Sequence, residues 1–85
     1  MKFKALVLVR LRASVSDAAG NAVRNHTKTA AKNLDVSVLR LGKAIDLEFE
    51  ASDRETAKKE LNKLSDQLLA NTVIEDWSYE LSEVE

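Results

Sequence analysis

The chain has 85 residues, and its thirteen Lys and Arg against fourteen Asp and Glu leave a formal charge of −1. This balance gives no support to a polyanionic partner such as DNA or RNA. The sequence has no cysteine and a single histidine, which excludes disulfides and a Cys/His metal cluster within the chain. A chain this short buries only about 60–65% of its unfolded surface, so association with other subunits is the natural remaining source of stability.

No apolar run approaches the roughly 20 residues that are needed to cross a bilayer. The opening stretch, Met1–Val9, superficially resembles a signal peptide. Its apolar part is short, however, and it is followed by Arg10 and Arg12, without a small-residue cleavage site. We therefore expect a cytoplasmic protein that forms one domain over residues 1–85.

Residues 2–12 alternate strictly, which predicts a strand with one fully apolar face. That face consists of Phe3, Ala5, Val7, Val9 and Leu11. On the other face Leu6 and Leu8 lie between two pairs of cations. This second face is either solvated, with two incidental leucines, or covered by another subunit.

The segment Ser14–Asp17 breaks the first strand and supplies N-cap side chains for a helix. The apolar stripe of this helix is thin and is built of small residues, at Ala19, Val23, His26 or Thr27, and Ala30. Gly20 in the first turn indicates close packing or a frayed start, because glycine costs about 1 kcal/mol relative to alanine in a helix.

Residues 36–41 and 44–51 read as two short strands around Gly42-Lys43. This spacing predicts a tight hairpin in which Gly42 takes a positive φ. In the second strand the apolar Ile45, Leu47 and Phe49 alternate with the acidic Asp46, Glu48 and Glu50.

The segment Ser52–Glu55 is a capping box, with Ser52 accepting from the backbone of Glu55. A helical stripe follows at Ala57, Leu61, Leu64 and Leu68. Asn71 suits the left-handed conformation that ends a helix. Residues 73–81 then alternate as the final strand, and residues 82–85 form an acidic tail that we expect to be frayed.

The resulting order is βαββαβ, which predicts an α+β fold with a four-stranded antiparallel sheet and both helices on one face. If the first and third strands are neighbours, their outer faces place cations opposite carboxylates, on either side of Leu6 and Leu8. This arrangement favours oligomerisation through the sheet.

The residue types offer little chemistry. Glu75 and Asp76 are adjacent, but neighbours on a strand point to opposite faces, so they do not share a substrate. The pair Arg40 and Lys43 flanks the glycine of the predicted hairpin, where it binds an anion or forms a solvated tip. We interpret His26 as a structural residue, and neither glycine belongs to a phosphate-binding loop.

The same element order occurs in RNA-binding modules and in dimeric regulatory domains that bind small molecules. RNA recognition needs stacking aromatics, whereas the third strand offers only Phe49 and has an acidic outer face. A small-molecule regulatory domain stays open as the competing hypothesis.

The run from Leu68 to Trp77, Leu-Leu-Ala-Asn-Thr-Val-Ile-Glu-Asp-Trp, resembles the signature of the PurS family. Two weaker matches are the Arg-x-Gly-Lys motif that begins at Arg40 and the Asp-x-x-Gly-x-Ala-Val motif that begins at Asp17. The sequence departs from the family pattern at Ala18 and Ala19, where proline and glutamine are usual. A further departure is Trp77, where tyrosine is commoner.

The resemblance implies a homo-oligomeric, non-catalytic subunit of phosphoribosylformylglycinamidine (FGAM) synthase. Such a subunit joins the PurL synthetase to the PurQ glutaminase and supports ammonia transfer in purine biosynthesis. ATP, magnesium and substrate then belong to the large subunit, so we expect no cofactor, metal or catalytic residue in this chain and no nucleic-acid or membrane partner. The candidate subunit-interface residues are Leu6, Leu8, Arg40, Gly42, Lys43, Asn71, Glu75, Asp76 and Trp77.

Overall fold

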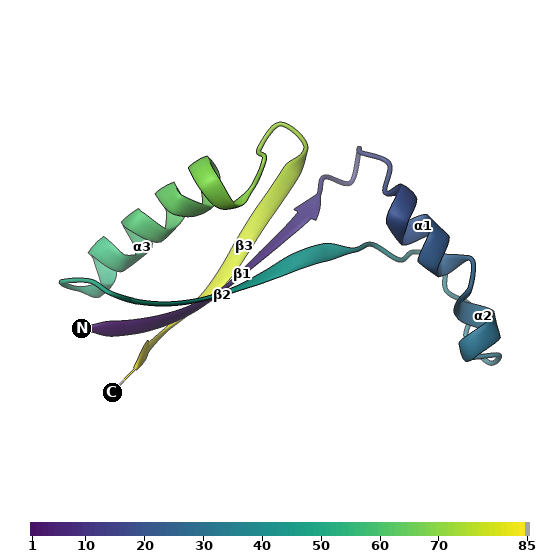
Figure 1. Ribbon diagram of the computed structural model, residues 1–85, viewed down its shortest axis with the longest axis horizontal. Coiled ribbons are helices and arrows are strands. Elements are labelled where there is room, and N and C mark those ends of the chain that lie inside the picture. Colours follow the sequence, from purple (N-terminus) through teal and green to yellow (C-terminus); the bar gives the residue numbers. More distant parts are fainter. Residues whose placement is uncertain (85) are drawn as a thin grey trace.

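The first strand lies in the centre of a three-stranded antiparallel sheet. In the computed structural model, which describes residues 1–84, β1 (Lys2–Leu11) pairs with β2 (Gly42–Glu50) on one side and with β3 (Glu75–Val84) on the other (Figure 1). The order β2-β1-β3 places the most apolar strand where it has two neighbours. The sheet therefore has three strands rather than the four that the sequence predicts.

The core lies between the inner face of the sheet and α3 (Arg54–Leu64), which covers that face (Figure 1). The predicted apolar face of β1 is confirmed, because Phe3, Val7 and Val9 are fully buried. From the helix, Ala57 and Leu61 are buried as well. Burying a side chain of this kind contributes about 1.5–3 kcal/mol.

The opposite side of the sheet, which we call the open face, has no helix over it in the part of the chain that the structure describes (Figure 1). It consists of the alternate residues of the three strands, with Leu6 and Leu8 half-buried in the centre. The expected pairing of the first and third predicted strands is confirmed. Lys4 lies opposite Glu48, and their side chains form an ion pair at 3.8 Å.

The first predicted helix does not lie beside α3. Instead α1 (Ala18–Arg24) and α2 (Thr27–Ala30) form an arm, residues 12–41, beyond the end of the sheet that is remote from both termini (Figure 1). The helix is divided at Asn25-His26, and its thin stripe provides no face broad enough to cover the sheet. The radius of gyration is 16.5 Å, against about 12 Å for a compact domain of this length.

The predicted hairpin around Gly42 is wrong, because Gly42 is the first residue of β2 and no described glycine has a positive φ. Residues 36–41 form no strand, since β1 ends at Leu11 and leaves them no neighbour to pair with. Glycine is needed here for another reason. A Cβ on Gly42 would lie 2.5 Å from Cγ of Arg10 and 2.6 Å from the carbonyl oxygen of Val9.

The N-cap of α3 is Asp53, one residue later than predicted. The Asp53 carboxylate accepts a hydrogen bond from the backbone N–H of Thr56 at 2.7 Å. Ser52 instead donates from its hydroxyl to the hydroxyl of Thr56. The bond from the Thr56 N–H also lowers the pKa of the Asp53 carboxyl, because it favours the charged form.

The helix does not end at Leu64 but continues as one π-helical turn, η1 (Ser65–Leu69). A π turn contains more residues than an α turn. The residues in and after it are therefore rotated about the helix axis, and a different side of the helix faces the core. Leu69 therefore packs against the core, whereas the predicted Leu68 is 73% exposed. Ser65 is fully buried, and its hydroxyl has no hydrogen-bond partner among the described residues.

Asn71 does not take the left-handed conformation that the sequence predicts, and no described residue does. Its side-chain oxygen accepts from the backbone N–H of Val73 at 3.2 Å, which forms a turn of the kind that asparagine favours. The last strand consequently begins at Glu75 rather than at residue 73. It continues to Val84, so the expected frayed tail is wrong for residues 82–84, and Glu85 lies outside the described residues.

Candidate interaction surfaces

The arm is joined to the sheet through a buried carboxylate. Asp17, the N-cap of α1, is only 6% exposed. Its two carboxylate oxygens accept from the backbone N–H of Gly20 at 2.8 Å and from that of Leu41 at 2.9 Å. These two bonds, reinforced by the nearby Arg40 charge, lower the pKa of the Asp17 carboxyl against the opposing effect of burial. Asp17 therefore ties the start of α1 to the segment that leads into β2.

Close packing explains Gly20, as the sequence indicated. A Cβ at this position would lie 2.6 Å from the Asp17 carboxylate and 2.6 Å from the carbonyl oxygen of Leu39. Because backbone atoms cannot yield as a flexible side chain can, any larger residue would separate α1 from the segment that includes Leu39.

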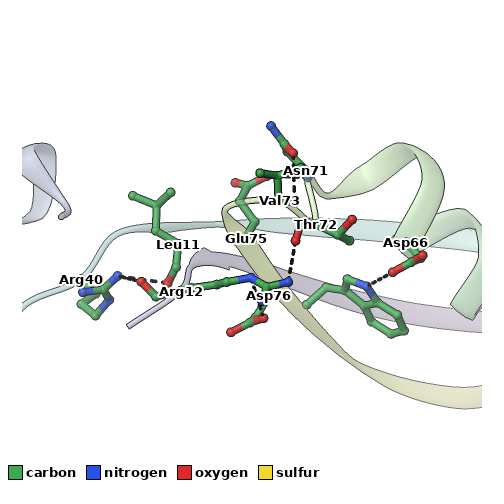
Figure 2. Close-up of polar contacts among 10 residues, drawn as sticks. Leu11, Arg12, Arg40, Asp66, Asn71, Thr72, Val73, Glu75 and Asp76 are labelled. Atoms are coloured by element: carbon green, nitrogen blue, oxygen red, sulfur yellow. Dashed lines mark hydrogen bonds and ion pairs between the residues drawn. The ribbon is translucent and has the colours of Figure 1, made fainter. Parts of the chain in front are cut away.

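Arg40 has a structural task at the same junction. Its guanidinium donates to the carbonyl oxygens of Leu11, Arg12 and Val15 at 3.0, 2.9 and 3.3 Å (Figure 2 shows the first two). Leu11 is the last residue of β1 and the other two residues follow it, beyond the point where the described β1–β2 ladder ends. Lys43, by contrast, is an exposed residue of β2. The two cations therefore do not form a common anion site at a hairpin tip.

The turn before β3 is braced by Asn71, Glu75 and Arg12 (Figure 2). The Asn71 backbone N–H donates to the Glu75 carboxylate at 2.8 Å, and the Asn71 carbonyl accepts from the backbone of Glu75 at 2.7 Å. Arg12 donates to the carbonyl oxygen of Thr72 and pairs with Asp76 at 3.5 Å. These contacts explain most of the polar residues in the run that suggested a family.

Trp77 lies on the inner side of the sheet, opposite Val9 in the β-ladder. Its ring packs against the core and stacks on Tyr79 with the centroids 6.0 Å apart. Its indole N–H donates to the Asp66 carboxylate at 3.3 Å. A structural role thus accounts for a residue that the sequence offered as an interface candidate.

Two apolar residues of the run from Leu68 to Trp77 are largely exposed, and the sequence patterns did not identify them as part of a surface. Val73 at the tip of the turn is 83% exposed, and Leu68 in the π turn is 73% exposed. Neither periodicity nor composition signals this exposure, because it depends on the π turn and on the turn braced by Asn71.

Several candidate residues gather at one end of the open face. A pocket of about 260 Å³ there is lined by Leu8, Arg10, Leu11, Ala13, Arg40, Asp76, Trp77 and Ser78. Leu6 lies farther along β1, and Glu75 and Asn71 lie in the turn. The structure thus brings Leu8, Arg40, Asp76 and Trp77 to one pocket, although the Trp77 ring packs against the core, and the other candidates lie outside it.

Within residues 1–84 no group of three or more His, Asp and Glu side chains is placed to hold a metal ion. His26 is an exposed N-cap of the short α2. Of the helices in this range, none is long and apolar enough to span a membrane. The main features of the described residues are therefore exposed surfaces and a turn that is fixed by hydrogen bonds.

Comparison with known proteins decides the family. The model of the PurS family, described as phosphoribosylformylglycinamidine (FGAM) synthase, matches residues 4–83. The chain is 44% identical over 79 residues to the FGAM synthase subunit PurS of Synechocystis, covering 93% of this chain and 78% of that protein. It is 40% identical over 82 residues to PurS of Bacillus subtilis, covering 96% and 95%. The chain belongs to the PurS family.

Solved PurS structures share the fold over almost the full length. The Bacillus subtilis PurS structure has a TM-score of 0.79 at 40% identity and covers 95% of this chain and 99% of its own. Thermus thermophilus PurS has a TM-score of 0.87 at 28% identity, with all of both chains covered. A chain in the structure of PurLQS from Thermotoga maritima has a TM-score of 0.82 at 37% identity and covers 99% of each chain. The PurS resemblance of the sequence is confirmed.

Proposed function

We propose that this chain is the homo-oligomeric, non-catalytic subunit of an FGAM synthase in the cytoplasm, where it joins a PurL synthetase to a PurQ glutaminase and supports ammonia transfer. The observation that supports this most directly is the match to a chain of the Thermotoga maritima PurLQS structure over 99% of both lengths. A likeness that extends over the whole chain supports a shared role because no element of that fold is missing from this chain.

The proposed division of labour leaves the chemistry to the partners. PurL binds ATP, magnesium and formylglycinamide ribonucleotide, and PurQ releases ammonia from glutamine. In this chain three of the four charged candidate residues already have structural bonds: Arg40 to three carbonyls, Glu75 to Asn71 and Asp76 to Arg12. Residues with structural bonds of this kind define the shape of the protein surface, and a subunit that joins two others acts through its surface.

Self-association is supported by the shape of the subunit. The arm extends away from the sheet, and four of its large apolar side chains are exposed: Val23, Leu34, Val38 and Leu41. On the open face Leu6 and Leu8 are only half-buried. A second copy that covered such surfaces would gain about 25 cal/mol for each Å² of apolar area removed from water.

Reconstitution with PurL and PurQ tests the function. With all three proteins present, we expect FGAM to form from glutamine, and omission of this chain to abolish that activity. Synthesis driven by added ammonia should persist without the chain, because the proposed role is assembly and ammonia transfer. Equal glutamine-driven rates with and without the chain would refute the proposal.

A binding measurement separates the competing hypothesis of a regulatory domain. Tagged protein should recover PurL and PurQ in the presence of glutamine and ADP. If it recovers neither partner, and an amino acid or nucleotide alone raises its melting temperature, a small-molecule regulatory domain becomes the better account.

A further inference from the structure

The open face contains an arginine that is held in place without a partner of its own. Within residues 1–84 the other four arginines each donate to a backbone carbonyl: Arg12, Arg24, Arg40 and Arg54. Within the same range Arg10 makes neither such a bond nor an ion pair. Asp76, which lies opposite it in the ladder, is paired with Arg12 instead.

Gly42 holds the Arg10 side chain in position. The two residues are opposite each other in the β-ladder, and the space of a Gly42 Cβ is filled by the Arg10 side chain, whose Cγ and Cδ would lie 2.5 and 3.5 Å away. The stem of Arg10 thus lies across the glycine. Arg10 as a whole is exposed, so its charged end is accessible to a carboxylate of another molecule.

The same face also contains two carboxylates that form no ion pair with residues 1–84. Asp46 and Glu80 lie on either side of Leu6, and neither forms an ion pair within the described part of the chain. Between this row and the row of Arg10 lies a small neutral row, in which Leu8 stands between Ala44 and Ser78.

We propose that two copies of this chain pack open face to open face about a two-fold axis that passes through the row of Leu8. An axis in this place, perpendicular to the strands, puts Arg10 of each copy over the Leu6 row of the other. Arg10 then lies between Asp46 and Glu80 of the second copy, and the contact is repeated by symmetry. The same axis brings Asp76 over Glu80 of the second copy, but Asp76 is already paired with Arg12, so Arg10 and Arg12 together offset the carboxylates at this contact. The inference rests on the homo-oligomeric state in the proposed function and adds its interface, axis and ion pairs.

This pairing tolerates the usual angle between packed sheets. Arg10 lies two residues from the axis, about 6.6 Å along the strand at about 3.3 Å per residue. Rotating one sheet by about 30° moves Arg10 sideways by about 3 Å, less than the spacing of about 4.8 Å between strands. Because a carboxylate flanks Leu6 on both sides, the shift brings Arg10 nearer to one of them whichever way it goes. The three small or apolar residues at the axis let the faces approach.

Charge reversal with complementation tests the interface, with oligomer mass measured by sedimentation at several concentrations. Arg10→Glu alone, and Asp46→Arg with Glu80→Arg alone, place like charges against each other. Each should therefore raise the dissociation constant by about 100-fold or more. An equimolar mixture of the two proteins should assemble again, because both contacts of the mixed dimer are then complementary. The control Lys59→Glu makes the same charge change on the exposed side of α3 and should leave the mass unchanged.

The outcomes separate the inference from the proposed function. Wild-type assembly that persists in both charge variants, or a mixture that fails to assemble, overturns this interface and leaves the proposed function standing. A wild-type chain that is monomeric at every concentration overturns both. If a reversed variant does not fold, Arg10→Gln replaces it, with an expected rise of about tenfold in the dissociation constant.

Discussion

At the scale of single residues, Asp17 connects two parts of the fold through one side chain. One carboxylate bonds to the first turn of α1 and to the backbone just before β2, while the Arg40 guanidinium close by holds the end of β1. The sequence predicts the capping role, because Asp precedes a helical segment. It does not predict the bond to Leu41, since that contact joins positions 24 residues apart.

We predict that Asp17→Asn lowers stability at neutral pH and flattens its dependence on acid. An amide can accept only through its oxygen, so its NH2 group would face a backbone N–H, at Gly20 or Leu41. In the wild type the pKa of Asp17 is lowered by folding. Its contribution is therefore complete above the unfolded pKa of about 3.9 and is lost as the pH falls through the lower folded pKa.

Urea unfolding between neutral pH and pH 2 measures this effect. The free energy of unfolding of the wild type should fall more steeply in acid than that of Asp17→Asn. Asp53, whose pKa is also lowered, contributes with the same sign in both proteins. The matched control is Asp35→Asn, which alters an exposed carboxylate whose contact with Lys28 is 3.9 Å long. Parallel pH profiles for wild type and Asp17→Asn would contradict the prediction.

At the scale of elements, sequence patterns predicted what depends on near neighbours. The alternation of β1 and the stripe of α3 from Ala57 to Leu61 are confirmed, because each expresses the geometry of one isolated element. Predictions that need a distant partner did less well: the pairing of β1 with β2 is confirmed, but the additional strand at residues 36–41 is wrong. Residues 36–41 have the composition of a strand, but a strand requires a neighbour, and β1 ends at Leu11.

The candidate site residues show the same difference between what near neighbours determine and what distant contacts determine. Gly42 and Arg40 were singled out because of a predicted hairpin, and that hairpin is wrong. Gly42 is required by the side chain that crosses it, and Arg40 by carbonyls at the end of another element. Such contacts are set by the tertiary arrangement and leave no periodic trace in the sequence.

The π turn gives a prediction that separates neighbouring leucines. Leu69→Ala should destabilise the fold by about 1–2 kcal/mol, because Leu69 is partly buried against the core. Leu68→Ala should change stability by less than about 0.5 kcal/mol, since Leu68 is 73% exposed. Chemical denaturation of both variants measures the difference. A larger loss for Leu68→Ala would mean that α3 continues without the π turn.

At the scale of the whole molecule, the chain is flat and its core is small. Its extents are 50 × 30 × 13 Å, and its buried apolar residues are few: Phe3, Ala5, Val7, Val9, Ala57, Leu61 and Ala70. A flat shape with a small core leaves much apolar surface in water. Association is the remaining way to remove it.

We therefore predict that the melting temperature rises with protein concentration. Only native chains associate with one another. Raising the concentration from about 1 to about 100 µM therefore shifts the equilibrium toward folded protein by mass action. Differential scanning fluorimetry or calorimetry over this range measures the shift. The Arg10→Glu variant should show a weaker dependence. A melting temperature that is the same at all concentrations would contradict the prediction.

The central position of β1 also has a consequence for how quickly the sheet can form. Lys2 pairs with Glu50 on one side and with Val84 on the other. Both ladders join segments that are far apart in the sequence, and such non-local pairing slows folding. A ribosome must therefore release most of the described chain before the strand that emerges first has both neighbours. Until then its alternating valines and leucines are exposed, and the cell must protect them from pairing with other nascent chains.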